Sequence, residues 1–85
     1  MSSIIVTVTD KNKTFFYDLD VPCDLTADKL MQDIAEAING LNPMLMVNAA
    51  STALLCKRIN HTIGHEETLD DAGVRNGDYL TLLQL

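Results

Sequence analysis

The amino-acid sequence predicts an α+β domain in which one main helix packs across one face of a mixed β-sheet. Two segments with alternating apolar side chains come first, and one segment with helical spacing follows them. Shorter alternating segments return after the helix, the last of them close to residue 85. Because 85 residues correspond to one domain, we expect residues 1–85 to share a single core.

The first two strands are predicted to form a hairpin. Residues 4–9 alternate in a run of β-branched side chains, and residues 15–21 alternate in the same way. The polar run 10–13 between them is a turn signal. Pro22 has no amide hydrogen to donate to a neighbouring strand, so we expect the second strand to end there.

The main helix is predicted to run from Ala27 to Asn39. Thr26 is a favourable N-cap residue, and Asp28 places negative charge at the positive end of the helix dipole. Gly40 is suited to a left-handed cap at the other end. Apolar residues recur at helical spacing between these ends, which predicts a buried face. The central positions of that face are Leu30, Ile34 and Ile38.

The segment from Leu41 to Thr52 gives the least definite pattern. Asn42-Pro43 indicates a turn, and both a hairpin and a short irregular helix fit the residues that follow. Residues 54–57 are then predicted as a third strand, with Ile63 in a short further strand. Residues 68–71 are predicted as a capped helical turn, and the alternation up to residue 83 predicts the last strand.

Composition excludes several classes of function. Twelve acidic and six basic residues give a net charge of −6, which argues against binding to nucleic acid or to an anionic membrane and is compatible with a basic protein partner. No apolar run has the length of a membrane span or of a signal peptide, so a cytoplasmic protein is expected. The two cysteines are predicted to be buried free thiols.

Residues capable of chemistry are present but form no catalytic pattern. His61 and His65 have a spacing that would place two imidazoles on one metal if they lay on a helix, but they fall in a predicted loop, and we expect no metal or cofactor. Asp70 and Asp71 open the short helical turn, where capping explains them better than acid–base chemistry. Neither cysteine has a catalytic motif around it, so no enzyme is predicted.

The motif formed by residues 68–71 and 73–78, Thr-Leu-Asp-Asp and Gly-Val-Arg-Asn-Gly-Asp, resembles the final stretch of ubiquitin-like proteins. Val21-Pro22 before the Thr26 cap, and Gly40 at the helix end, have the same spacing. The chain is similar to the small bacterial ubiquitin-like proteins of the YukD/EsaB type, which accompany type VII secretion systems. This resemblance implies a ubiquitin-like β-grasp topology, in which the first and last strands are parallel neighbours.

The resemblance also implies a function. Ubiquitin and its sulfur-carrier relatives need a flexible diglycine tail for activation, whereas this sequence ends at Gln84-Leu85. We therefore expect a ubiquitin-like protein that is not conjugated and that binds or regulates a type VII secretion system. The alternatives are a small ubiquitin-like subunit of a multicomponent oxygenase and a truncated sulfur carrier or protein modifier.

Recognition by ubiquitin uses the sheet face that points away from the helix, and the resemblance directs attention to the same face here. Strand alternation places several apolar side chains on it. We expect cytosolic components of the secretion apparatus to bind there; a homodimer and scattered exposure without a partner are the alternatives. The predicted partner-binding residues are Ile5, Phe16, Leu55, Lys57, Leu83 and Leu85.

Overall fold

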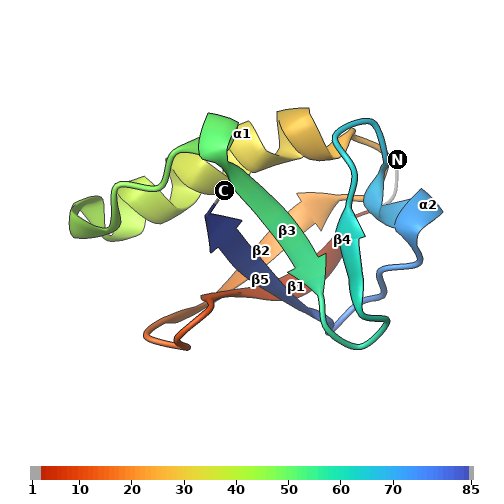
Figure 1. Ribbon diagram of the computed structural model, residues 1–85, viewed down its shortest axis with the longest axis horizontal. Helices are drawn as coiled ribbons and strands as arrows, with labels where there is room; N and C mark the ends of the chain where they lie inside the picture. Colours follow the sequence, from red (N-terminus) through yellow and green to blue (C-terminus); the bar gives the residue numbers. More distant parts are fainter. Residues whose placement is uncertain (1–2, 85) are drawn as a thin grey trace.

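The computed structural model describes residues 3–84 and confirms the predicted arrangement of one main helix across a mixed sheet (Figure 1). The strands are β1 (Ser3–Asp10), β2 (Phe16–Pro22), β3 (Thr52–Cys56), β4 (His61–Ile63) and β5 (Tyr79–Gln84). The helices are α1 (Ala27–Leu41) and α2 (Leu69–Ala72), and two 3₁₀ turns are η1 (Pro43–Leu45) and η2 (Ala49–Ser51).

The five strands form one sheet in the order β2-β1-β5-β3-β4. β1 and β2 are the predicted antiparallel hairpin. β5 then lies between β1, to which it is parallel, and β3, to which it is antiparallel. The parallel pairing of the first and last strands is confirmed, with Val8 opposite Leu80. This is the β-grasp topology, and the helix supplies the crossover that a hairpin followed by a parallel strand requires.

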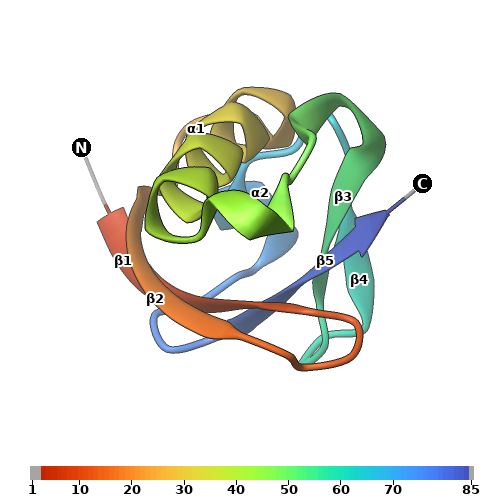
Figure 2. The same cartoon turned by 90° about the vertical axis from the view of Figure 1, so that its left-hand side faces the viewer.

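The core lies between α1 and one face of the sheet (Figure 2). The predicted helix positions Leu30, Ile34 and Ile38 are all buried, as helical spacing requires. They pack with alternate residues of the central strands. The fully buried strand residues are Val6, Val8, Leu54, Cys56 and Leu80. We call the opposite side of the sheet, which points away from α1, the outer face.

The predicted end of α1 is wrong by two residues. The helix passes through Gly40, which does not have a positive φ, and its last hydrogen bond is donated by the backbone N–H of Asn42 to Ile38 O at 2.8 Å. Asn39 therefore lies inside the helix, and its side chain bonds to the segment that follows the helix. Its Nδ2 donates to Val47 O at 2.9 Å, and its Oδ1 accepts from Val47 N at 2.8 Å. These two bonds fix the following segment against the helix.

The two predicted N-caps differ in the structure. Thr68 caps α2 as expected, since its Oγ1 accepts a hydrogen bond from Asp71 N at 3.0 Å. Thr26 occupies the N-cap position of α1, but its side chain makes no bond to the helix backbone. Its hydroxyl instead donates to Asp28 Oδ1 at 2.6 Å. The cap position was therefore predictable from residue type, whereas the hydrogen-bond partner was not.

The ambiguous segment after α1 forms the two 3₁₀ turns, so the irregular-helix alternative is nearer the structure than the hairpin. Asparagine side chains open both turns: Asn42 Oδ1 accepts from Met44 N, and Asn48 Oδ1 accepts from Ala50 N at 3.0 Å. Met44 is 87% exposed. None of the described helices is long and apolar enough to cross a membrane.

Candidate partner-binding surface

The outer face is organised around a row of side chains that crosses four strands. Thr9 of β1 lies opposite Phe16 of β2 on one side and Thr81 of β5 on the other, and Thr81 lies opposite Leu55 of β3. Both threonines are buried, at 3% and 5% exposure, although they point away from α1. Larger side chains around them must therefore cover this part of the sheet.

Two aromatic side chains flank the threonines. The rings of Phe16 and Tyr79 have centroids 6.2 Å apart and an interplanar angle of 81°, which is the edge-to-face arrangement that aromatic pairs favour. Phe16 is 53% exposed and Tyr79 is 54% exposed. The pair is thus fixed on one side and open to solvent on the other, which suits contact with another molecule.

The aromatic pair borders a hollow of about 470 Å³ on the outer face. Cationic side chains reach it from two turns, Lys13 from the β1–β2 turn and Lys57 with Arg58 from the β3–β4 turn. We call this hollow the basic pocket. Its lining residues are Thr9, Lys13, Phe16, Lys57, Arg58, Gly77, Asp78, Tyr79 and Thr81.

One carboxylate, Asp78, holds a wall of the basic pocket in place. Its Oδ1 accepts from Arg58 Nε at 2.7 Å, and its Oδ2 accepts from Arg58 Nη2 and from Arg75 N, each at 2.8 Å. Asp78 is 8% exposed, and the Arg58 hydrogen bonds lower its pKa to about 2. The backbone also contributes, because Thr7 N donates to Asp78 O at 2.9 Å. Asp78 therefore joins β1, the β3–β4 turn and the start of β5.

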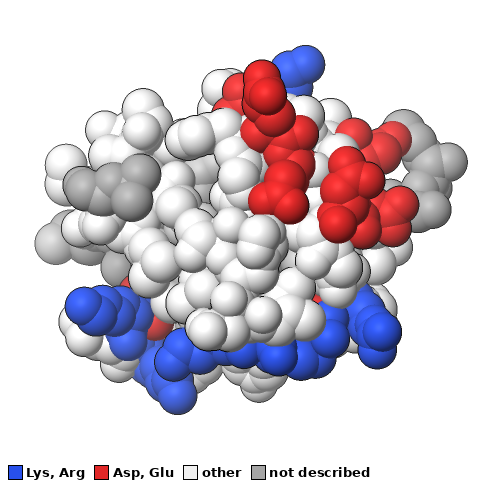
Figure 3. Space-filling view, turned by 45° about the vertical axis from the view of Figure 1, so that its right-hand side comes forward, with Lys and Arg blue, Asp and Glu red and all other residues white. Residues whose placement is uncertain are grey.

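Positive charge gathers on the side of the molecule away from α1. In Figure 3 Lys and Arg side chains line the lower edge, and Asp and Glu side chains gather above them. The sequence positions agree with this view, since all but one of the six basic residues lie in the turns between strands and in the loop before β5. The exception is Lys29, in the first part of α1. The protein therefore has a basic region on this side although its net charge is −6.

The structure brings together some of the predicted partner-binding residues. Phe16 and Leu55 lie in the row described above, and Lys57 lines the basic pocket. Leu83 is half-buried and lies further along β5, opposite Ala53. Ile5 is exposed but stands apart, opposite Asp20 near the other end of β1. Leu85 lies outside the described residues.

Sequence reasoning missed several residues of this surface. The alternation that assigns Leu83 to the outer face assigns Tyr79 and Thr81 to it as well, so the signal was present in β5. Lys13 and Arg58 had no such signal. They lie in turns, and the sequence pattern does not determine which face a turn residue reaches.

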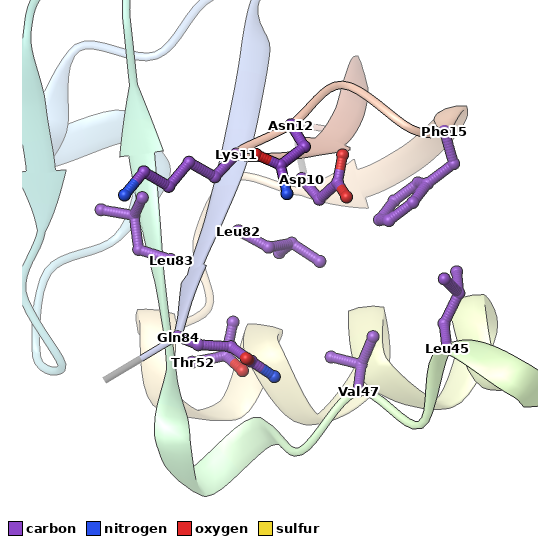
Figure 4. Close-up of a pocket in the computed structure, with 10 residues that line it drawn as sticks. All are labelled: Asp10, Lys11, Asn12, Phe15, Leu45, Val47, Thr52, Leu82, Leu83 and Gln84. Carbon is purple, nitrogen blue, oxygen red and sulfur yellow. The ribbon is translucent and has the colours of Figure 1, made fainter.

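A second hollow, of about 630 Å³, opens at another edge of the molecule (Figure 4). It lies between the β1–β2 turn, the η1 segment and the end of β5. Phe15, Leu45 and Val47 supply much of its apolar lining, and Leu82 projects into it from β5. Its charged lining residues are Asp10 and Lys11, so it lacks the positive balance of the basic pocket.

The two histidines do not converge on a common site. His61 lies in strand β4, not in the loop that was expected, and its Nε2 is 2.9 Å from Glu67 Oε1. Glu67 Oε1 also accepts from Gly64 N at 2.7 Å, and these bonds hold the pKa of Glu67 below its ordinary value. His65 is exposed. Within residues 3–84, no group of three or more metal-ligating side chains is found.

The cysteines are buried and unpaired, as predicted. Burial raises the pKa of the Cys23 thiol and of the Cys56 thiol. Both are therefore protonated at neutral pH, which suits packing and not nucleophilic chemistry.

Comparisons with known proteins agree with the fold and identify relatives. A family model described as "WXG100 protein secretion system (Wss), protein YukD" matches residues 3–82. The ubiquitin-like domain of the Mycobacterium tuberculosis type VII secretion system protein EccD1 superposes with a TM-score of 0.76 at 19% identity, covering 99% of this chain and 100% of that one. The EccD5 ubiquitin-like domain from Mycobacterium xenopi gives 0.78 at 13% identity, covering 100% and 97%.

The fold extends beyond secretion systems. Caldiarchaeum subterraneum ubiquitin superposes with a TM-score of 0.72 at 18% identity, covering 99% of this chain and 95% of that one. At such identities the structural likeness establishes the ubiquitin-like β-grasp fold and nothing finer. A comparison with curated protein sequences finds no significant match.

Proposed function

Because the chain belongs to the YukD family of the WXG100 protein secretion system, we propose that it is a non-enzymatic, non-conjugated binding or regulatory protein of that system and acts in the cytoplasm. The observation that carries this proposal is the open outer face, where large side chains are held in fixed positions yet remain half exposed. Exposed aromatic and apolar side chains that a rigid sheet holds in place are typical of protein–protein interfaces.

The mechanism is docking of a preformed surface. Hydrogen-bonded strands carry Phe16, Leu55 and Leu83, so the backbone positions of these side chains are fixed before a partner arrives. A rigid sheet loses little conformational entropy on binding, and partner association then needs little change of shape. The proposed partners are cytosolic components of the secretion apparatus. The proposed interface retains the predicted residues Ile5, Phe16, Leu55, Lys57, Leu83 and Leu85.

The experiment replaces half-buried outer-face residues by a charge. Leu55→Asp and Leu83→Asp, each introduced at the native locus, are expected to leave the fold intact while stopping co-purification with the secretion machinery and secretion of WXG100 proteins. Met44→Asp is the control, because it introduces the same negative charge at an exposed apolar residue in η1, outside the sheet. Circular dichroism of each purified variant establishes that it is folded.

Normal secretion and normal co-purification in both outer-face variants, with each of them folded, would contradict the proposal. Loss of secretion in Met44→Asp alone would indicate that the interface lies in the segment that contains Met44 and not on the outer face. A covalent conjugate of the endogenous protein, detected by mass spectrometry, would contradict the non-conjugated role.

A further inference from the structure

The local charge of the basic pocket is opposite to the charge of the whole protein. The chain carries a net charge of −6, which by itself favours a basic partner. The basic pocket is lined by three cationic side chains and one carboxylate, so its own balance is +2. A partner that docks on this part of the sheet therefore meets positive charge first.

The cationic side chains of the pocket are not equally free to pair with a ligand. Arg58 is committed to Asp78 through two hydrogen bonds, and its Nη2 also donates to Gly73 O at 2.8 Å. Lys13 and Lys57 are exposed, and within residues 3–84 neither of them forms an ion pair. The two lysines approach the hollow from different turns. They leave two ammonium groups beside the aromatic pair without a negative partner.

Resting on the proposed function, we propose that the basic pocket binds a short acidic segment of the protein partner, in which Asp or Glu residues alternate with apolar or aromatic residues. The carboxylates of the segment pair with Lys13 and Lys57. Its apolar side chains lie against Phe16 and Tyr79, the half-exposed pair that adjoins both cations. Fixed aromatic side chains beside lysines provide both the apolar and the charged contacts that such a segment needs.

The same face argues against an extended polyanion as the ligand. Asp18 and Asp20 follow Phe16 along the outer side of β2 and are exposed. A lipid surface or a nucleic-acid duplex lying across the sheet would bring phosphates towards these carboxylates. A short segment held in the pocket avoids them. The observations therefore favour a peptide.

The test uses the whole protein and a defined probe. The ¹⁵N-labelled protein is titrated with the peptide acetyl-Glu-Leu-Glu-Phe-Glu-Leu-amide, and separately with the same peptide carrying Gln at every Glu. We expect amide shifts at Thr9, Tyr79 and Thr81 with the acidic peptide only, and weaker binding as NaCl is raised. Lys57→Glu is expected to weaken binding roughly fivefold or more.

Lys29→Glu is the matched control. It changes the net charge from −6 to −8, as Lys57→Glu does, but it lies on α1. Equal weakening by both variants, or no shift at the pocket amides, overturns the proposal. Tighter binding of duplex DNA or of phosphatidylserine vesicles than of the peptide, lost in Lys57→Glu, also overturns it and identifies a polyanion site.

Secretion by the same variants separates this proposal from the broader one. If Leu55→Asp and Leu83→Asp stop secretion while Lys13→Glu and Lys57→Glu do not, the outer face is the interface and the acidic segment is wrong. If Lys13→Glu and Lys57→Glu weaken peptide binding while none of the four variants affects secretion, the pocket is an acidic-segment site and the proposed interface is wrong.

Discussion

Replacing Asp78 by Asn should destabilise the protein in a pH-dependent way. The carboxylate is nearly buried and accepts hydrogen bonds from Arg58 and from the Arg75 backbone N–H. Asn has a similar shape, but it turns an amide donor towards Arg58 and removes the negative charge. The β3–β4 turn and the start of β5 then lose their common anchor.

The expected magnitude follows from the pKa of Asp78, which is lowered from 3.8 to about 2. At roughly 1.4 kcal/mol for each pH unit, this corresponds to about 2 kcal/mol of folding free energy at neutral pH. The Arg58 side chain is 39% exposed, so solvent screens part of the interaction. We therefore expect Asp78→Asn to lose between about 1 and about 2 kcal/mol at pH 7.

The sign of the pH dependence is fixed by the direction of the pKa change. A carboxylate whose pKa is lower in the folded than in the unfolded state stabilises the fold above the unfolded value. That stability is lost as the pH falls through the folded value, here from 3.8 towards about 2. The difference in unfolding free energy between wild type and Asp78→Asn should thus be largest at neutral pH and decrease across this interval.

Urea denaturation followed by circular dichroism measures the difference in unfolding free energy at each pH. Asp33→Asn is the control, because it removes the same charge from an exposed position on α1. A loss at pH 7 no larger than that of the control would refute the reasoning. A difference between wild type and Asp78→Asn that stays constant from neutral pH to pH 2 would refute it as well.

Two further predictions concern the fold itself. Leu80→Ala should cost about 2–5 kcal/mol in unfolding free energy by urea denaturation, since Leu80 is fully buried in the central strand; a loss under about 1 kcal/mol would contradict its place in the core. Thr68→Ala should cost about 1 kcal/mol by the same measurement, and Thr26→Ala should cost less because only Thr68 bonds to its helix backbone. Equal losses at the two threonines would contradict this account of the caps.

The sequence predicts the fold well because each element has its own periodic signal. Alternation identified β1 and β2, and helical spacing identified the buried face of α1. The errors in the predicted helix ends and caps occur where a side chain forms a different hydrogen bond from the one that the local sequence indicates. Asn39-Gly40 is a local stop signal, but α1 continues to Leu41 and the Asn39 side chain bonds to Val47. The parallel pairing of β1 and β5 was expected mainly from the family resemblance.

The candidate site was less predictable than the fold because part of it is formed by turns. Strand parity assigned Phe16, Leu55 and Leu83 to the outer face, and the structure places them there or at its edge. Parity does not apply to turns, so Lys13 and Arg58 could not be assigned to the pocket. Nor could the sequence show that the Asn-Gly-Asp motif does more than turn the chain. Its aspartate pairs with an arginine that lies 20 residues earlier.

The composition of the outer face bears on how the proposed interface would select its partner. Its centre is occupied by Thr9 and Thr81, whose β-branched side chains favour strands without adding a broad apolar surface. The apolar contacts stand around this centre as separate groups, with Phe16 and Tyr79 on one side and Leu55 on the other. Such a face has too little continuous apolar area to associate with any hydrophobic surface it meets. For the proposed interface, we therefore expect charge to contribute to the choice of partner through the lysines beside the aromatic pair.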